Sequence, residues 1–367
     1  MADIAWFDAH LDLAMLAVLG RDMTARPEAI PVGGEWGGTA GLTLASLVEG
    51  NVRLCLGTIF TEPDGKTAEG YPAGDAERAF VVGRAQIEVY LTWRDRGLVG
   101  LDRLASVRAG DGLGEVRGGM GVAEMSPLWT RKRLAMVPAK PAIHLGILME
   151  NADPIRSPAE LAWWKERGVV AVGMAWAKSS RYAGGNSTTA GLTAMGRDFV
   201  REMDRLGLVH DVSHLSDRSF GELCEATQRR VFASHSNCRA ITDPTGANQR
   251  HLTDVQIREI VRRGGVIGVN LYSAFLREGL KEAGRATVAD VVAHVERVCE
   301  IAGSRRHVGM GSDMDGGFSA DRMPEGIDRP RDYRRISDAL SGRGWSDDEV
   351  LDFAAGNWMR MFGSIPG

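Results

Sequence analysis

Residues 6–13 read WFDAHLDL, and apolar side chains alternate in this stretch with Asp8, His10 and Asp12. Alternation with a period of two is typical of a β-strand, so the three polar groups are expected on one face. A solvent-facing edge strand would explain the pattern without any chemistry. A metal site would explain it better if later parts of the chain supply further ligands, because imidazole and carboxylate groups bind zinc and similar ions.

Short apolar runs like this one recur along the chain and alternate with helix-like segments. Helical spacing of apolar residues is found over 75–97, 158–167, 192–206, 217–228, 253–263 and 287–302. Eight predicted strands that alternate with these helices indicate an α/β fold of the (β/α)8 TIM-barrel type. A doubly wound open sheet is the alternative, and the lack of GxGxxG after the first strand disfavours it. The predicted strands are 4–10, 52–60, 142–149, 169–175, 208–214, 230–236, 265–272 and 307–313.

The length of 367 residues exceeds the roughly 250 residues that such a barrel needs. We expect a single domain over 1–367, with the barrel at about 4–317 and a C-terminal helical extension at about 332–363. The surplus is expected in an excursion over 61–140 and in long loops near 177–191 and 238–252.

The composition narrows the class of protein. The net charge is −4 and both signs are mixed throughout, which argues against nucleic acid and anionic membranes as partners. No apolar run is long enough to span a bilayer, and no export signal precedes the first strand. The four cysteines form no CxxC pair. Together these features predict a soluble cytoplasmic protein.

Histidines and carboxylates gather where the predicted strands end, which is where a barrel of this type carries its chemistry. Single residues of this kind are usually structural, but the joint pattern predicts a metal site. Five ligands are more than one tetrahedral zinc ion needs and fit two ions that share a carboxylate and a water molecule. Such a pair generates a hydroxide nucleophile near neutral pH. The predicted ligands are His10, Asp12, Glu150, His214 and His235.

Asp8 and the other histidines are not predicted to bind metal. Asp8 lies one pleat deeper than His10, so we expect it to support the ligands or to pack within the barrel. Five histidines lie away from strand exits and are interpreted as structural: His144, His210, His251, His294 and His307.

The motifs at the strand ends resemble those of the membrane (renal) dipeptidase family, whose members are binuclear zinc hydrolases on an amidohydrolase-type barrel. The resemblance runs in order over roughly 4–317. Each motif is weak by itself, and their joint order is specific. The stretches that carry it are DAHLDL, GILMEN, LGLVHDVSHLS, VFASHSN, QRHLTD, GGVIGVNLY and HVGMGSDMDG.

The resemblance implies a role for each predicted site residue. His10, Asp12 and Glu150 would hold one metal ion, and Glu150 would bridge to a second ion bound by His214 and His235. Asp313 would shuttle a proton from the bridging hydroxide to the leaving amine. Arg250 would pair with a substrate carboxylate, and Tyr272 would also contact the substrate. Two divalent ions, with zinc preferred, and a homodimer are implied in the same way.

One departure from the family pattern bears on the substrate. The family has a histidine after the fourth strand that helps to hold the scissile oxygen, whereas this chain has Ala175 and Trp176 there. Trp176 is expected either to line an apolar substrate pocket or to pack at the barrel rim. The first hypothesis is a dipeptidase-type amide hydrolase, and the missing histidine favours the same site with a different substrate. The alternatives are the same dinuclear site acting on an N-acyl amino acid, D-residue dipeptide, cyclic amide or lactone, and a binding protein without catalysis.

Overall fold

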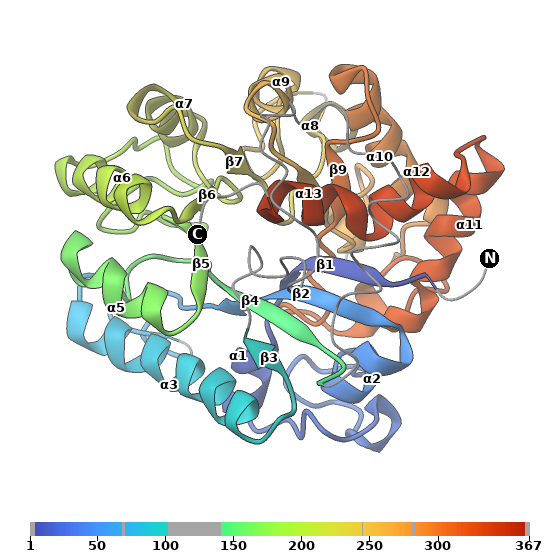
Figure 1. The fold of residues 1–367 in the computed structure, drawn as a ribbon, viewed down its shortest axis with the longest axis horizontal. Helices are drawn as coiled ribbons and strands as arrows, with labels where there is room; N and C mark the ends of the chain where they lie inside the picture. The colour runs from blue at the N-terminus through green and yellow to red at the C-terminus, as the bar shows by residue number, and fades with distance from the viewer. Residues whose placement is uncertain (1–3, 68–69, 102–140, 244, 281–283, 364–367) are drawn as a thin grey trace, which may run out of the picture.

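The computed structural model describes residues 4–67, 70–101, 141–243, 245–280 and 284–363. Within them, parallel strands form one sheet in the order β7-β6-β5-β4-β2-β1-β9-β8, with the short β3 beside β4. A bridge between Ala233 and Ile267 connects the two ends of this order. The sheet is thus a nearly closed barrel surrounded by helices (Figure 1). This confirms the predicted (β/α)8 class.

Each of the eight predicted strands has a counterpart, and several are shorter than predicted. The chain leaves the ladder after β6 and β9, where His214 and Asp313 have φ angles of 66° and 58°. These left-handed conformations cannot continue a strand. Strand β3 (Gly100–Leu101) has no predicted counterpart. The other strands are β1 (Trp6–Leu11), β2 (Val52–Ile59), β4 (His144–Met149), β5 (Val169–Gly173), β6 (Val209–Asp211), β7 (Val231–Phe232), β8 (Ile267–Val269) and β9 (Val308–Met310).

The predicted helices are present, and several have the caps that define their first turn. In α9 and α10, Thr253 and Thr287 each accept a hydrogen bond from the backbone N–H three residues later, in a capping box. No helix of the described residues is long and apolar enough to cross a membrane. The helices that follow the strands are α3 (Ala76–Asp95), α5 (Leu161–Glu166), α6 (Ala194–Leu206), α7 (Asp217–Ala226), α9 (Asp254–Arg262) and α10 (Val288–Ala302). Shorter helices α1 (Leu13–Val18), α2 (Leu44–Glu49) and α8 (Arg239–Thr242) lie in the connections.

The surplus residues lie partly in these connections and partly in the C-terminal extension. Of the predicted 61–140 excursion, residues 102–140 lie outside the described part of the chain. The extension contains α11 (Arg334–Gly342), α12 (Asp347–Leu351), a π-helical turn (Asp352–Gly356) and α13 (Asn357–Gly363).

Helix α13 fills the barrel from the end where the strands begin. In Figure 1 it lies across the middle of the ring of strands. Trp358 and Phe362 pack on Phe7 of β1 and Phe232 of β7, with ring centroids 5.6–5.9 Å apart. The Trp358 indole N–H donates to the carbonyl of Met310, at 3.0 Å. Aromatic side chains fill the barrel at the amino ends of its strands. The polar residues lie at the opposite end, where the strands finish.

A bulge in β1 separates Asp8 from the residues beyond it. Asp8 of β1 pairs with Cys55 of β2, and Leu11 pairs with Gly57. β1 therefore has one more residue than β2 between the two pairs. Asp8 accepts hydrogen bonds from the Tyr333 hydroxyl at 2.8 Å and the Ser312 N–H at 2.9 Å. The expectation that Asp8 shares a face with His10 and Asp12 is therefore wrong, because the bulge interrupts the period of two. Asp8 also accepts a hydrogen bond from the His10 N–H at 3.3 Å, so it supports a predicted ligand, one of the two roles expected for it, and it packs β1 against the C-terminal extension.

Candidate metal centre

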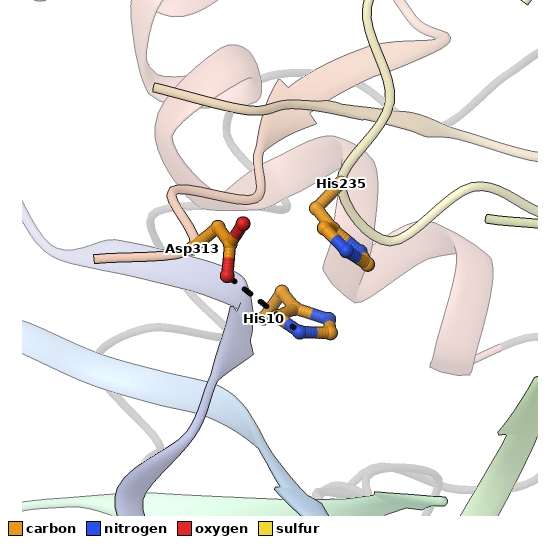
Figure 2. A group of neighbouring side chains, drawn as sticks. All are labelled: His10, His235 and Asp313. Carbon is orange, nitrogen blue, oxygen red and sulfur yellow. Dashed lines mark ion pairs between the residues drawn. The ribbon is translucent and has the colours of Figure 1, made fainter. Parts of the chain in front are cut away.

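The five predicted ligands come together at the carboxyl end of the barrel. His10 and Asp12 lie at the end of β1, Glu150 directly after β4, and His214 and His235 in the turns after β6 and β7. All five side chains are buried. Three overlapping groups have ligand atoms within 4.8 Å of one another: His10–Asp12–Glu150, Glu150–His214–His235 and His10–His235–Asp313. Figure 2 shows how the last of these groups converges from different elements.

Glu150 lies at the centre of this cluster, and its two oxygens face different partners. Oε1 is 3.3 Å from His214 Nε2 and 3.4 Å from His235 Nε2. Oε2 is 3.5 Å from His10 Nε2. The Nε2 atoms of His214 and His235 are themselves 3.0 Å apart. One carboxylate is thus placed between two sets of nitrogen atoms.

The outer nitrogen of each imidazole is engaged by an oxygen. His214 Nδ1 lies 2.9 Å from Asn186 Oδ1. His235 Nδ1 and His10 Nδ1 lie 2.7 and 3.2 Å from the same hydroxyl, that of Ser234. A proton on each Nδ1 satisfies these contacts and leaves a lone pair on each inward-facing Nε2.

With the outer nitrogens protonated, the inward-facing Nε2 atoms are acceptors grouped around the Glu150 carboxyl group. His10 Nε2 is buried and has no hydrogen-bond partner. Burial lowers the pKa of His214 and His235 well below the usual value, so neither ring is a ready cation. Burial likewise raises the pKa of Glu150 to about 8. The residues present fit divalent cations, which would satisfy all of these lone pairs at once.

Asp12 and Asp313 border the cluster on the side of β1 and β9. Asp12 accepts a hydrogen bond from the Thr58 hydroxyl of β2. Asp313 Oδ1 points toward His10 Nε2 at 4.0 Å, and its Oδ2 accepts a hydrogen bond from the Asn270 amide at 2.9 Å. Burial raises the pKa of Asp313 to about 8. Gly316 is needed beside them, because any Cβ there would collide with Asp313 Oδ1.

Arg250 is buried next to the cluster. Its guanidinium donates to the Ser236 hydroxyl at 3.2 Å and to the His235 carbonyl at 2.8 Å. Its Nε is buried without a partner, and no carboxylate of the described residues lies within ion-pairing distance of it. An unpaired buried guanidinium is costly and is suited to an anionic ligand.

Tyr272 and Trp176 lie among aromatic side chains near the same end of the barrel. Tyr272 packs on Phe318 and Phe275, with centroids 4.5 and 4.9 Å away. The Arg250 guanidinium carbon lies 5.1 Å from the Phe275 ring. Trp176 packs on His214 at 5.7 Å and on Phe60 at 5.2 Å, and it is partly exposed. The indole of Trp176 therefore packs directly against His214, a predicted ligand.

The histidines interpreted as structural lie in none of the candidate metal groups found in the described part of the chain. His210 Nε2 contacts Asp204 at 2.8 Å, and His307 Nδ1 contacts the Gly265 carbonyl at 2.8 Å. His294 lies between the Cys238 N–H and the Leu276 carbonyl.

Four residues that support the cluster were missed by sequence reasoning: Asn186, Asp211, Ser234 and Asn270. Asp211 and Ser234 are in the segments HDVSH and SHS, whose spacing beside a ligand is a usable signal. Asn186 lies in a long loop, and nothing in its sequence context distinguishes it.

A (β/α)8 barrel with imidazoles and carboxylates at the strand exits defines the class of metallohydrolase-type barrels. The chain belongs to the membrane dipeptidase family (peptidase family M19), whose family model matches residues 1–366.

Several curated proteins are similar to the chain in part. An uncharacterized dipeptidase of Schizosaccharomyces pombe is 33% identical over 178 residues, which are 48% of this chain and 41% of that protein. Human dipeptidase 3 is 31% identical over 192 residues, 52% of this chain and 37% of that protein. The chain thus spans less than half the length of these two relatives.

Two solved structures match the fold over 99% of this chain and 100% of theirs. Dipeptidase AC, a metallopeptidase of family M19, is 24% identical with a TM-score of 0.76. A metallopeptidase from Rhodobacter sphaeroides, liganded with a phosphinate mimic of the dipeptide L-Ala-D-Ala, is 23% identical with a TM-score of 0.77. At this identity the likeness establishes the fold.

Proposed function

We propose that this protein is a metal-dependent hydrolase that cleaves the amide bond of small dipeptide-like substrates carrying a free carboxylate. The observation that carries the proposal is the convergence of three imidazole Nε2 atoms on the two oxygens of the buried Glu150. Membership of the membrane dipeptidase family supports the same reaction.

The donor set supports two divalent ions, and zinc is the ion we propose. His10, Asp12 and Glu150 Oε2 would hold one, and Glu150 Oε1, His214 and His235 would hold the other. Bound there, the pair would polarise the scissile carbonyl and lower the pKa of a water molecule toward neutrality. Histidine nitrogen and carboxylate oxygen are the ligands that zinc prefers when no thiolate is present.

The chain's own residues would orient the substrate and move the proton. Asp313 Oδ1 faces the cluster, while Asn270 holds its other oxygen; the free oxygen accepts a proton from the attacking water and returns it to the leaving amine. Arg250 binds the substrate carboxylate through the donor that has no protein partner. Tyr272 and Trp176 line the two aromatic sides of the substrate site.

A second candidate keeps the site and changes the substrate. Trp176 occupies the place where the family resemblance implies a histidine donor, and its indole packs on the ring of His214. An apolar wall there favours a bulky apolar group over a polar one, as in an N-acyl amino acid or a D-residue dipeptide.

A substrate panel tests both candidates. Zinc-loaded protein is assayed with L,L-dipeptides, L,D-dipeptides, N-acyl amino acids and lactones, and each rate is compared with that of Asp313→Asn. Hydrolysis of L,L-dipeptides that depends on Asp313 supports the first candidate. Turnover confined to another class supports the second, and no turnover of any substrate contradicts both and favours a binding protein.

The cellular compartment, the domain organisation and the oligomeric state are also part of what we propose. We place the protein in a reducing, cytoplasmic compartment, which the four free cysteines support. The single-domain organisation and the homodimer stay predictions, and sedimentation of the full chain tests the second of them.

A further inference from the structure

One hydroxyl, that of Ser234, contacts two of the proposed metal ligands. It lies 2.7 Å from His235 Nδ1 and 3.2 Å from His10 Nδ1. These two histidines are assigned to different ions, and their rings stack with centroids 3.5 Å apart. Ser234 is fully buried, and its carbonyl packs so closely on Gly268 and Gly311 that neither position can carry a side chain. The hydroxyl is thus held in place by the backbone around it.

The direction of each hydrogen bond at Ser234 follows from its third partner. Its oxygen lies 2.6 Å from Asp211 Oδ2. Asp211 Oδ1 already accepts the backbone N–H groups of Ser213 and Ser234, at 3.0 and 2.9 Å. A carboxylate only accepts, so the single Ser234 proton goes to Asp211. The two lone pairs of the hydroxyl are then left for two Nδ1–H donors.

We propose that Asp211 and Ser234 form a positioning pair that keeps His10 and His235 in the same tautomer, and so couples the two metal positions. With both protons on Nδ1, both Nε2 lone pairs face Glu150. Groups behind metal-ligating histidines commonly fix the tautomer in this way, and their loss typically costs about 10–100-fold in metal affinity. Here one hydroxyl would serve two ligands of two ions. The inference rests on the proposed metal assignment and not on the identity of the substrate.

Two substitutions have different expected effects, which a merely structural role would not produce. Ser234→Ala removes the acceptor of both Nδ1–H groups, so both zinc dissociation constants should rise about 10–100-fold. In Asp211→Asn the amide oxygen must stay on the two backbone N–H groups, so the amide nitrogen turns toward Ser234. The Ser234 proton is then driven to its nearest other acceptor, His235 Nδ1. Asp211→Asn should therefore weaken the ion bound by His214 and His235 more than the ion bound by His10.

The matched control is Ser213→Ala. The Ser213 hydroxyl lies in the same cluster, 3.4 Å from the Ser234 hydroxyl and 3.2 Å from the His235 backbone N–H, and it bonds to no imidazole nitrogen. Its loss should leave both zinc dissociation constants within about threefold of wild type, since it removes buried polar contacts but no tautomer support.

Zinc affinity is measured by chelator competition, and the tautomers are read from 15N-histidine spectra of the metal-free protein, assigned with His10→Gln and His235→Gln. We expect Nδ1–H on both rings in wild type and Nε2–H on His235 in Asp211→Asn. Zinc affinities of Ser234→Ala that match those of Ser213→Ala would overturn the proposal. If the variants do not fold, the wild-type spectrum decides, because Nε2–H on either ring contradicts the pair. Dipeptide hydrolysis is assayed separately, so failure of the proposed function leaves these readouts interpretable.

Discussion

His214 Nε2 and His235 Nε2 lie 3.0 Å apart, although the two residues follow different strands. If both rings carry their protons on Nδ1, two lone pairs face each other here, which is unfavourable unless a cation lies between or beside them. The backbone supports the arrangement at a cost, because His214 has a φ of 66°, a conformation worth about 1–3 kcal/mol of strain. The close contact is therefore interpreted as a ligand position, and it leads to predictions that can be checked one residue at a time.

Glu150→Gln should weaken zinc binding without destabilising the metal-free protein. The substitution keeps the shape of the side chain but removes the charge shared by both proposed ions, so zinc affinity should fall by more than the roughly 10–100-fold that loss of a supporting contact costs. In chelator, the variant should be at least as stable as wild type, because an uncompensated buried carboxyl group is removed. Thermal unfolding with and without zinc measures both effects, since bound zinc raises the midpoint by linkage.

The control for this experiment is Glu225→Gln, at an exposed position on α7. Its zinc-dependent rise in the unfolding midpoint should equal that of wild type. An equal rise in Glu150→Gln would show that Glu150 is not a ligand.

Asp313→Asn should lower kcat by about 10²–10⁴ while the zinc content stays near that of wild type. The amide can still bond to Asn270, but it cannot accept a proton from water. Steady-state kinetics beside metal analysis distinguish the two effects. Loss of zinc in parallel with kcat would instead make Asp313 a ligand, consistent with its place beside His10 and His235.

Arg250→Met should lower activity mainly toward substrates that carry a free carboxylate. Methionine keeps much of the length and apolar contact of arginine next to Phe275, without the charge. We expect kcat/KM to fall roughly 10–100-fold for a free-acid dipeptide, from the loss of a hydrogen bond to a charged group worth about 1.5–3 kcal/mol. The same dipeptide with an amidated C-terminus should change little. Equal losses for acid and amide would refute the assignment.

His294 gives the fold a defined acid sensitivity. Its Nδ1 accepts from the Cys238 N–H at 3.1 Å, and its Nε2–H donates to the Leu276 carbonyl at 3.0 Å, so only the neutral ring fits. Burial lowers its pKa to about 4. The unfolded chain, with an ordinary pKa near 6.5, then binds more protons than the folded protein between these values, so stability falls as the pH falls. The loss from about pH 6.5 to about pH 4 should approach about 3 kcal/mol.

Urea unfolding in chelator measures this dependence, with His294→Gln as the comparison. The variant keeps an acceptor and a donor but does not titrate, so its free energy of unfolding should fall less over the same range. Parallel pH profiles for the two proteins would show that His294 does not contribute.

The sequence predicted the barrel because strand and helix periodicities are local properties, and each predicted strand is present. It predicted that the five proposed ligands lie close together, because strand exits in a parallel barrel converge at one end. Local patterns could not predict the bulge between Asp8 and Leu11, since the extra residue is defined by pairing with β2. Nor could they predict that Ser234 contacts His10, because 224 residues separate the two and only the closed barrel brings them together.

The same limit applies to Trp176. Its place after the fourth predicted strand, which is β5 in the structure, is readable from the sequence, but its packing on His214 depends on the turn after β6 and the left-handed residue there. Side-chain partners across the barrel were therefore the least predictable part of the site, although they define its chemistry.

In the proposed centre, Glu150 lies between two divalent ions. Crystals of zinc-loaded protein, measured at the zinc absorption edge, test this most directly. We expect two anomalous peaks about 3.5–4 Å apart, the first beside His10 and Asp12 and the second beside His214 and His235, with Glu150 touching both. A single peak, or peaks away from Glu150, would contradict a dinuclear centre bridged by this residue.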